Sequence, residues 1–336
     1  MPESARQSRP PYFPGIQALR AIAALLVVLQ HSIVYTCEAA GIGYGDYLKL
    51  GFGLWGVMLF FCISGFVIGL NRHLPAGTFA VRRALRIYPA FLATCALSIA
   101  ILAAIGAEAR LDVATALLLP VSSLNDSLRI PYWTLVFEVA FYALAAAAFW
   151  FRPTDRALSI AAAAWIVLAQ LFGRYFPNEA AATAPGALIL VSPYTQLFAL
   201  GMLACLHQDE LGRIDPRAII AIAAACLFAL STFPMTPVGY VLVQGIVCAG
   251  AVVLAARAAA APAPARWLGD ASYGLYLLHL PVIVVLASAF TGSWLARYPL
   301  LLFAVIAVSS AAVGAAFGAI EHSAHRRIAR VAPARP

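Results

Sequence analysis

Runs of about 20 mostly apolar residues recur along almost the whole chain, and this pattern constrains the fold more than any other feature. A helix of about 20 residues is as long as the hydrocarbon core of a bilayer is thick. Of the 336 residues, 63% are hydrophobic and 11% are charged, whereas a soluble domain carries about a quarter charged residues. Because a bilayer offers no hydrogen-bond partners to the backbone, runs of this length predict helices. We therefore expect an all-α, polytopic membrane protein.

Ten of these runs are predicted to span the membrane. They cover residues 16–36, 51–70, 84–106, 132–151, 157–176, 186–207, 217–233, 237–256, 271–290 and 298–320. A shorter apolar stretch, 111–124, is compatible with an interfacial or re-entrant helix that ends at Pro120. The segments 177–186 and 258–265 are rich in Pro, Gly or Ala and predict loops.

The positions of the basic residues predict the orientation. With ten spans and a cytoplasmic N-terminus, sixteen of the 22 Lys and Arg residues fall in inner segments and five in outer segments, and Arg20 lies within the first span. This bias follows the positive-inside rule and places both termini in the cytoplasm. The sequence predicts a single transmembrane domain over 15–322, between polar tails at 1–14 and 323–336, in a bacterial inner membrane.

Charge and cysteine content exclude two other classes of function. The formal net charge is +8, but the arginines lie between apolar runs, where topology explains them, and no basic stretch alternates with aromatic residues. We expect no nucleic-acid partner. The six cysteines are scattered through apolar runs without a CxxC pair, which predicts packing residues rather than a metal site.

Ionisable residues inside spans are informative, because each costs about 2.5–3.5 kcal/mol on insertion. Arg20 and His31 lie eleven residues apart in the first span, which puts both on one helix face about 16 Å apart. They predict a shared cavity, although a snorkelling Arg20 and a packed His31 would give the same pattern. Glu138 is predicted at the depth of His31, so we expect a His31–Glu138 hydrogen bond. The alternative for Glu138 is a protonated packing carboxyl.

Two further groups extend the candidate site. Ser272, Tyr276 and His279 lie at i, i+4 and i+7, hence on one helix face, and predict either a lining of the same cavity or an interhelical hydrogen-bonding stripe. The cluster Arg82, Arg83 and Arg86 predicts a phosphate clamp, because guanidinium groups match phosphate oxygens. The alternatives are a topology signal or contacts with anionic lipid headgroups.

Together these groups permit a donor that has a phosphate-rich end and a long arm with a reactive tip. Acyl-CoA has this chemistry. The arginines would hold its phosphates at the cytoplasmic side, and the arm would reach towards His31. Composition and spacing permit this arrangement without proving it.

Five motifs in order resemble the integral-membrane acyltransferase-3 family, whose members include bacterial O-acyltransferases of surface sugars. They are LRAIAALLVVLQH, GVMLFFCISGFVI, RRALRIYP, YWTLVFEVAFY and SYGLYLLHLP. The resemblance runs from Gly15 to about Arg326. The closing AIEHSAHR resembles the family's terminal acidic motif, but has His322 and Ser323 where a basic residue and proline are usual.

The resemblance implies a ten-helix fold with cytoplasmic termini, in agreement with the span count. It implies that His31 is the catalytic histidine, that Arg20 is its essential partner, and that Arg83 and Arg86 contact the donor's phosphates. It also implies a site lined by Glu138, Tyr276 and His279. Trp133 and Ser272, which lie in the same motifs, are assigned with them to substrate binding.

The function expected from the sequence is transfer of an acyl group, most simply acetyl, from cytoplasmic acyl-CoA to a hydroxyl of a surface glycan or glycolipid. Acyl-CoA is then a co-substrate, and no tightly bound cofactor is expected. A secondary transporter or proton-coupled exporter would also carry His, Glu and Arg in its spans, but such proteins usually show internal repeats, and no clear repeat is present. A non-catalytic scaffold would not need Arg20 and His31 on one face. The acceptor and the oligomeric state are not predicted.

Overall fold

Helices make up the regular structure of the described part of the chain. The computed structural model describes all residues except 1–11, 50, 122, 177–185, 187 and 332–336. Eight helices are long and apolar enough to cross a membrane. They are α1 (Pro14–Ala40), α3 (Phe52–Leu70), α4 (Ala76–Ala103), α6 (Trp133–Trp150), α7 (Asp155–Tyr175), α12 (Pro237–Arg257), α13 (Ala263–Phe290) and α14 (Pro299–Val331). The chain is therefore an all-helical, polytopic membrane protein, as the apolar runs predicted.

The described residues also form two shorter apolar helices and six short helical elements. The apolar helices are α9 (Thr195–Leu206) and α11 (Pro216–Thr232). The short elements are α2 (Gly45–Leu48), α5 (Val113–Ala116), η1 (Asp126–Leu128), η2 (Ile189–Val191), α10 (Gln208–Gly212) and η3 (Trp294–Arg297). Because α9 has only 12 residues, the count of ten spans stays a prediction.

Several boundaries differ from the sequence prediction, and three of the differences bear on the site. The helix α4 begins eight residues earlier than predicted, so Arg82 and Arg83 lie inside it rather than before its start. The helix α13 also begins eight residues earlier, since residues 263–265 are helical rather than part of a linker. The helix α14 continues past 322, where a tail was predicted to start. The stretch 111–124 forms only the four-residue α5, and most of 177–186 lies outside the described residues.

Local sequence explains where these helices begin. Proline stands at the first helical position of α1, α11 and α12, where its missing N–H and fixed φ cost nothing. The side chains of Asp215 and Thr236 accept hydrogen bonds from the first turns of α11 and α12. At the other end of α1, Gly41 closes the helix with a φ of 68°, a left-handed conformation that glycine adopts readily. Pro89 and Pro281 stand inside α4 and α13 and each removes one backbone hydrogen bond.

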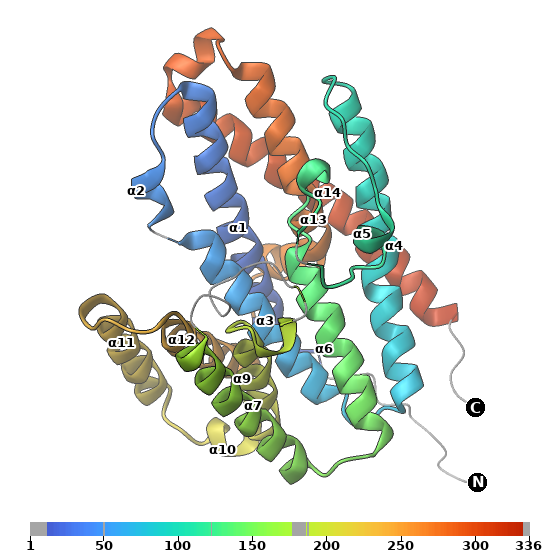
Figure 1. The fold of residues 1–336 in the computed structure, drawn as a ribbon, viewed down its shortest axis with the longest axis vertical. Coiled ribbons are helices and arrows are strands. Elements are labelled where there is room, and N and C mark those ends of the chain that lie inside the picture. Colours follow the sequence, from blue (N-terminus) through green and yellow to red (C-terminus); the bar gives the residue numbers. More distant parts are fainter. Residues whose placement is uncertain (1–11, 50, 122, 177–185, 187, 332–336) are drawn as a thin grey trace.

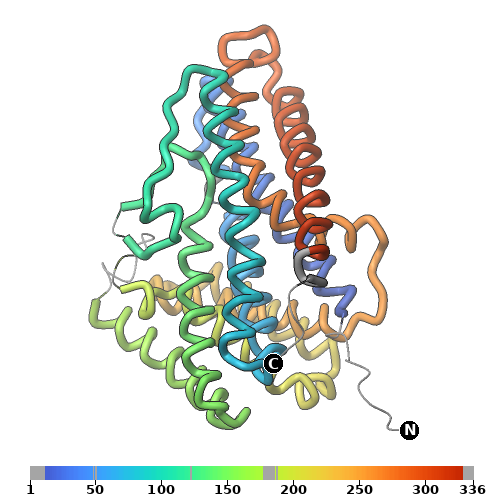
Figure 2. The backbone as a smooth tube through the Cα atoms, turned by 90° about the vertical axis from the view of Figure 1, so that its right-hand side faces the viewer, coloured from blue at the N-terminus to red at the C-terminus, as the bar shows by residue number. Residues whose placement is uncertain are grey.

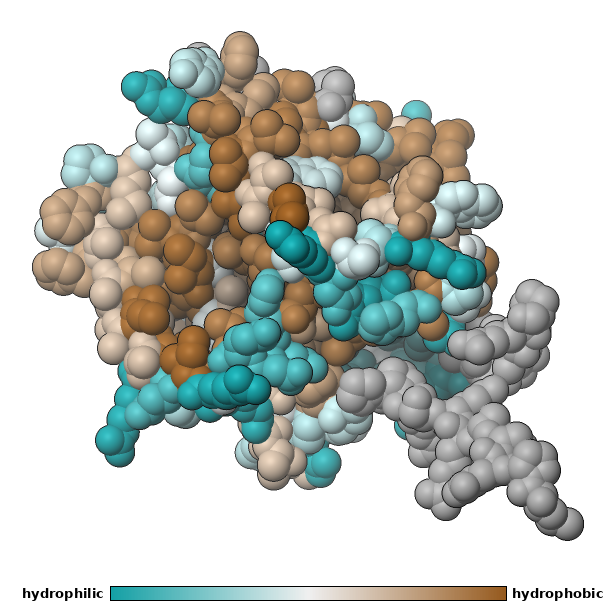
Figure 3. Space-filling model, turned by 90° about the horizontal axis from the view of Figure 1, so that it is seen from below, coloured by the Kyte–Doolittle hydropathy of each residue, from teal (hydrophilic) through white to brown (hydrophobic). Residues whose placement is uncertain are grey.

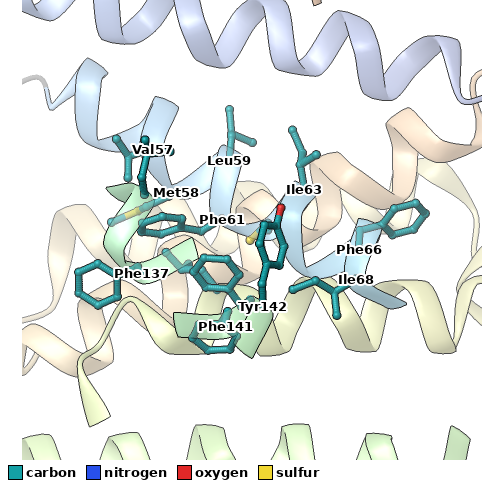
Figure 4. Packing of buried hydrophobic residues seen from close by; sticks show 14 of the residues in the cluster. Val57, Met58, Leu59, Phe61, Ile63, Phe66, Ile68, Phe137, Phe141 and Tyr142 are labelled. Atoms are coloured by element: carbon teal, nitrogen blue, oxygen red, sulfur yellow. The ribbon is translucent and has the colours of Figure 1, made fainter. Parts of the chain in front are cut away.

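The long helices form one bundle in which α1 occupies a central place (Figure 1, Figure 2). The helices α13 and α14 form an antiparallel pair, and α1 packs chiefly against α13 and α3. Small residues let helices approach closely: a Cβ on Gly201 would lie 1.9 Å from the carbonyl oxygen of Cys62 in α3. Aromatic and aliphatic side chains of α3 and α6 fill the interior beside this crossing, as Figure 4 shows for Phe61, Phe137 and Phe141.

Candidate active site

A cavity of about 110 Å³ lies between α1, α3, α4, α6 and α13. One part of its wall carries charged side chains and another carries aromatic and aliphatic ones. The charged and hydroxyl-bearing residues of the wall are Arg20, Ser64, Arg83, Arg86, Thr134, Glu138, Tyr142, Tyr273 and Tyr276. Four helices, α1, α4, α6 and α13, thus bring the predicted Arg20, Arg83, Arg86, Glu138 and Tyr276 to one space.

The arginines of the cavity are only partly neutralised. Arg86 forms a salt bridge with Glu321 of α14, and its guanidinium lies 4.8 Å from the ring centre of Tyr273. Arg83 lies over the rings of Phe79 and Tyr142, and its Nε is buried without a hydrogen-bond partner. Among the described residues, Arg20 and Arg83 form no salt bridge. Buried guanidinium groups without carboxylate partners favour an anionic ligand.

The predicted hydrogen bond between His31 and Glu138 is wrong. The carboxylate of Glu138 instead accepts hydrogen bonds from Ser64 Oγ at 3.0 Å and from the hydroxyl of Tyr142 one turn along the same helix. The reason is helix packing: α1 packs chiefly against α13 and α3, whereas α6 packs chiefly against α4. Although His31 and Glu138 have the same predicted depth, their helices α1 and α6 are not neighbours at these residues.

The partner of His31 is His279. Nε2 of His279 lies 3.1 Å from Nδ1 of His31, and the ring centres are 5.1 Å apart. Each Nδ1 also faces a backbone carbonyl of its own helix: His31 that of Val27 at 3.0 Å, and His279 that of Leu275 at 3.2 Å. The pair joins α1 to α13, and His279 is fully buried.

These contacts determine the tautomers. A carbonyl oxygen only accepts, so both Nδ1 atoms carry a hydrogen. Nε2 of a neutral His279 is then an acceptor, and the Nδ1–H of His31 is shared between this nitrogen and the Val27 carbonyl. Nε2 of His31 is left with a free lone pair. This is the nitrogen that a general base uses to take a proton.

Tyr276 links the cavity to the histidine pair. It lines the cavity, and its ring centre lies 6.0 Å from that of His279 one turn further along α13. Its hydroxyl donates to the carbonyl of Pro131 at 2.8 Å and lies 2.7 Å from Thr134 Oγ1. These bonds hold the ring in the wall of the cavity.

Three residues assigned to the site from the sequence lie elsewhere. Arg82 is exposed on α4 and does not line the cavity, unlike Arg83 and Arg86. Trp133 packs in an aromatic cluster with Phe61. Ser272 is fully buried, and its Oγ has no hydrogen-bond partner.

Three other residues that sequence reasoning did not assign belong to the site. Ser64 and Tyr142 hold Glu138, and Glu321 pairs with Arg86. Tyr142 follows Glu138 by four residues, a spacing that puts both on one helix face and gave a usable signal. Glu321 lies in the closing motif, which differs from the family pattern at the next two residues and was therefore a weak signal for its carboxylate.

A membrane-embedded helical bundle with an arginine-lined cavity and a nearby histidine pair defines a class: a polytopic membrane enzyme. A family model described as an acyltransferase domain matches residues 13–314, so the chain belongs to the acyltransferase-3 family of membrane acyltransferases. The chain is similar to Nodulation protein 10 of Rhizobium leguminosarum bv. viciae, with 25% identity over 316 residues that cover 82% of this chain and 84% of the relative. No solved structure matches the chain.

Proposed function

We propose that this membrane acyltransferase transfers an acyl group, most simply acetyl, from acyl-CoA to a hydroxyl of a sugar in a surface glycan or glycolipid. The observation that carries the proposal is the contact geometry of His31: its Nδ1 lies 3.0 Å from the Val27 carbonyl and 3.1 Å from Nε2 of His279, which assigns the ring hydrogen to Nδ1 and leaves Nε2 to take a proton. The family membership favours this chemistry over the transporter considered from the sequence.

The arginines of the cavity would bind the donor. Arg20 and Arg83 form no salt bridge among the described residues, and a diphosphate would supply the missing negative charge. Arg86, already paired with Glu321, completes the basic wall. Glu138, held by Ser64 and Tyr142, sets the charge of the wall rather than orienting His31.

The chemical step follows from the free nitrogen of His31. Nε2 removes the proton of the acceptor hydroxyl while the oxygen attacks the thioester carbonyl carbon. The new C–O bond forms, the C–S bond breaks, and the proton taken by His31 passes to the leaving thiolate, so the products are the ester and CoA. His279 acts through His31 and is a positioning residue.

The test is acyl transfer from labelled acetyl-CoA by purified protein in detergent, with surface glycolipid extract as acceptor. His31→Ala is expected to reduce the rate by about 10²–10⁴-fold, the usual contribution of a general base. The matched control is His73→Ala, which removes an exposed histidine from the turn between α3 and α4. A folded His31→Ala protein with the wild-type rate would refute the assignment. Transport requires a closed membrane, so transfer in detergent also separates the enzyme from an exporter.

The acceptor is identified by a different measurement. Mass spectrometry of surface glycans and lipids from cells with and without the gene should show a loss of one acyl unit in one species. The mass of that unit gives the acyl chain and the species gives the acceptor. Unchanged spectra under conditions in which the protein is present would contradict a surface-sugar acceptor.

A further inference from the structure

A second pocket, distinct from the cavity, opens where α13 begins and α14 ends. Its volume is about 410 Å³. It is lined by Tyr12, Ala263, Arg266, Trp267, Asp270, Ala271, Ala319, His322, Ser323 and Arg326. In Figure 2 the first turns of α13, the last turns of α14 and the start of α1 lie together on one side of the bundle. Figure 3 shows an end view in which hydrophilic residues gather in patches between apolar ones.

The pocket has the chemistry of an anion site. Two guanidinium groups, Arg266 and Arg326, and the imidazole of His322 face it, against a single carboxylate, Asp270. Nε of Arg266 is buried and has no hydrogen-bond partner. Ala263 places the N-terminus of the 28-residue α13 at the pocket wall, and the free N–H groups of a helix start also favour a negative group.

Aromatic side chains border the same pocket. Trp267 is 53% exposed although it lies beside apolar helices, and Tyr12 is 55% exposed. Partial burial, followed by the charge of Asp270, raises the pKa of the Tyr12 hydroxyl, which places this ring next to the carboxylate. An exposed indole beside guanidinium groups suits a planar base attached to a phosphate.

The two pockets lie along the same helix, α13. Arg266 and Asp270 line the second pocket, and Tyr273 and Tyr276, the next residues along the helix at spacings of three, line the cavity. From Arg266 to Tyr276 the helix rises about 15 Å. On α14, Glu321 pairs with Arg86 of the cavity while the adjacent His322 faces the second pocket. One elongated ligand would therefore contact both basic clusters.

We propose that this second pocket, named here the 266–326 pocket, binds the adenosine 3′-phosphate end of CoA. The inference rests on the proposed function and names the part of the donor that the cavity does not explain. CoA carries two separate anionic groups, a diphosphate and a 3′-phosphate monoester beside adenine. The cavity supplies one basic cluster and the 266–326 pocket supplies another, with an indole for the base.

The experiment measures binding of CoA and of dephospho-CoA, which lacks only the 3′-phosphate, by calorimetry on the full chain in phosphatidylcholine nanodiscs. The wild-type protein is expected to bind CoA at least about tenfold more tightly than dephospho-CoA, the effect of one charge-assisted contact. Arg266→Gln and Arg326→Gln should bring CoA affinity to the dephospho-CoA level and leave dephospho-CoA affinity unchanged within about twofold. The matched control is Arg327→Gln, the exposed neighbour of Arg326 outside the pocket.

Trp267→Leu provides a second readout, because the loss of stacking should weaken the binding of both CoA and dephospho-CoA by about tenfold. Equal binding of CoA and dephospho-CoA by the wild-type protein overturns the proposal. The proposal also fails if phosphatidic acid added to the disc stabilises the wild-type protein but not Arg266→Gln, while Arg266→Gln keeps the preference for CoA. The pocket then binds a lipid phosphate. Absence of any CoA binding by the wild-type protein refutes the proposed donor itself, so the two failures are distinguishable.

Discussion

Replacement of His279 tests whether this residue positions His31 or takes part in the chemistry. In His279→Leu the Nδ1–H of His31 loses its 3.1 Å acceptor but keeps the Val27 carbonyl at 3.0 Å. The proton therefore stays on Nδ1, and only the hydrogen bond to His279 is lost. A net hydrogen bond contributes about 0.5–1.5 kcal/mol, which corresponds to roughly a 2- to 13-fold fall in kcat.

His279→Gln should restore most of this loss, because the side-chain amide oxygen can accept from His31 as Nε2 does. The assay is acetyl transfer from labelled acetyl-CoA in detergent, with kcat and the KM for the donor measured separately. The reduction should fall on kcat and leave the donor KM within about twofold, since His279 does not line the cavity. Elution as a monodisperse peak in size-exclusion chromatography serves as the folding control.

Two results would refute this reasoning. A 10³-fold loss in His279→Leu, comparable with that expected for His31→Ala, would mean that His279 itself handles a proton. Equal activity of the Leu and Gln variants at a reduced level would mean that packing, not the hydrogen bond, is what His279 contributes.

Three further predictions concern stability. Glu321→Gln leaves Arg86 buried without its partner and should destabilise the protein by about 3–5 kcal/mol in equilibrium unfolding by a denaturing detergent. Gly201→Ala brings a Cβ within 1.9 Å of the Cys62 carbonyl oxygen and should cost about 1–3 kcal/mol in the same assay. Hydrogen bonds from the start of α5 lower the pKa of Asp112, so the stability that it adds to this turn is present above about pH 4 and is lost as pH falls through the lowered pKa. The protection factor of the capped backbone N–H, the ratio of its intrinsic to its observed hydrogen-exchange rate, should therefore fall at low pH, as it should in Asp112→Ala at pH 7.

The Glu321 and Gly201 changes each have a matched control in the chain. Glu108→Gln breaks an ion pair whose two side chains are both 83% exposed and should change stability by less than about 0.5 kcal/mol. A Cβ on Gly212 would meet nothing within 4 Å, so Gly212→Ala should be close to neutral. Losses of equal size in variant and control would contradict the burial argument. A protection factor at the start of α5 that does not change with pH would contradict the cap.

The helices were predictable because each apolar run satisfies a length requirement that the bilayer sets locally. The residues at the cavity were predictable for a similar reason, since Arg20 and Glu138 are costly in a membrane unless they face a polar space. Which of them touch was not predictable. Depth along a span fixes one coordinate of a side chain, but the neighbours of a helix and its rotation depend on packing with the whole bundle. His31 and Glu138 share a predicted depth yet bond to His279 and to Ser64 and Tyr142.

Helix ends were the second source of error, with consequences for function. The sequence predicted that spans three and nine begin at residues 84 and 271, after Arg83 and Arg266, because a hydropathy pattern loses its signal where polar residues start. Both helices continue through that region, so Arg266 and Trp267 stand on a helix face rather than in a loop. The 266–326 pocket depends on this extension and on the similar extension of α14 past 322.

The contacts of Tyr276 bear on the rate of the proposed acyl transfer. Tyr276 lines the cavity with its ring centre 6.0 Å from that of His279, and neither histidine lines the cavity, so the proposed donor would have to pass this ring to reach His31. The ring is held by the contacts of its hydroxyl with Pro131 and Thr134, together worth about 1–3 kcal/mol net. A typical enzyme turning over about ten times per second crosses a barrier of about 16 kcal/mol. Breaking these two contacts accounts for only a small part of such a barrier, so Tyr276 can keep the donor apart from the base between turnovers without setting the rate of acyl transfer.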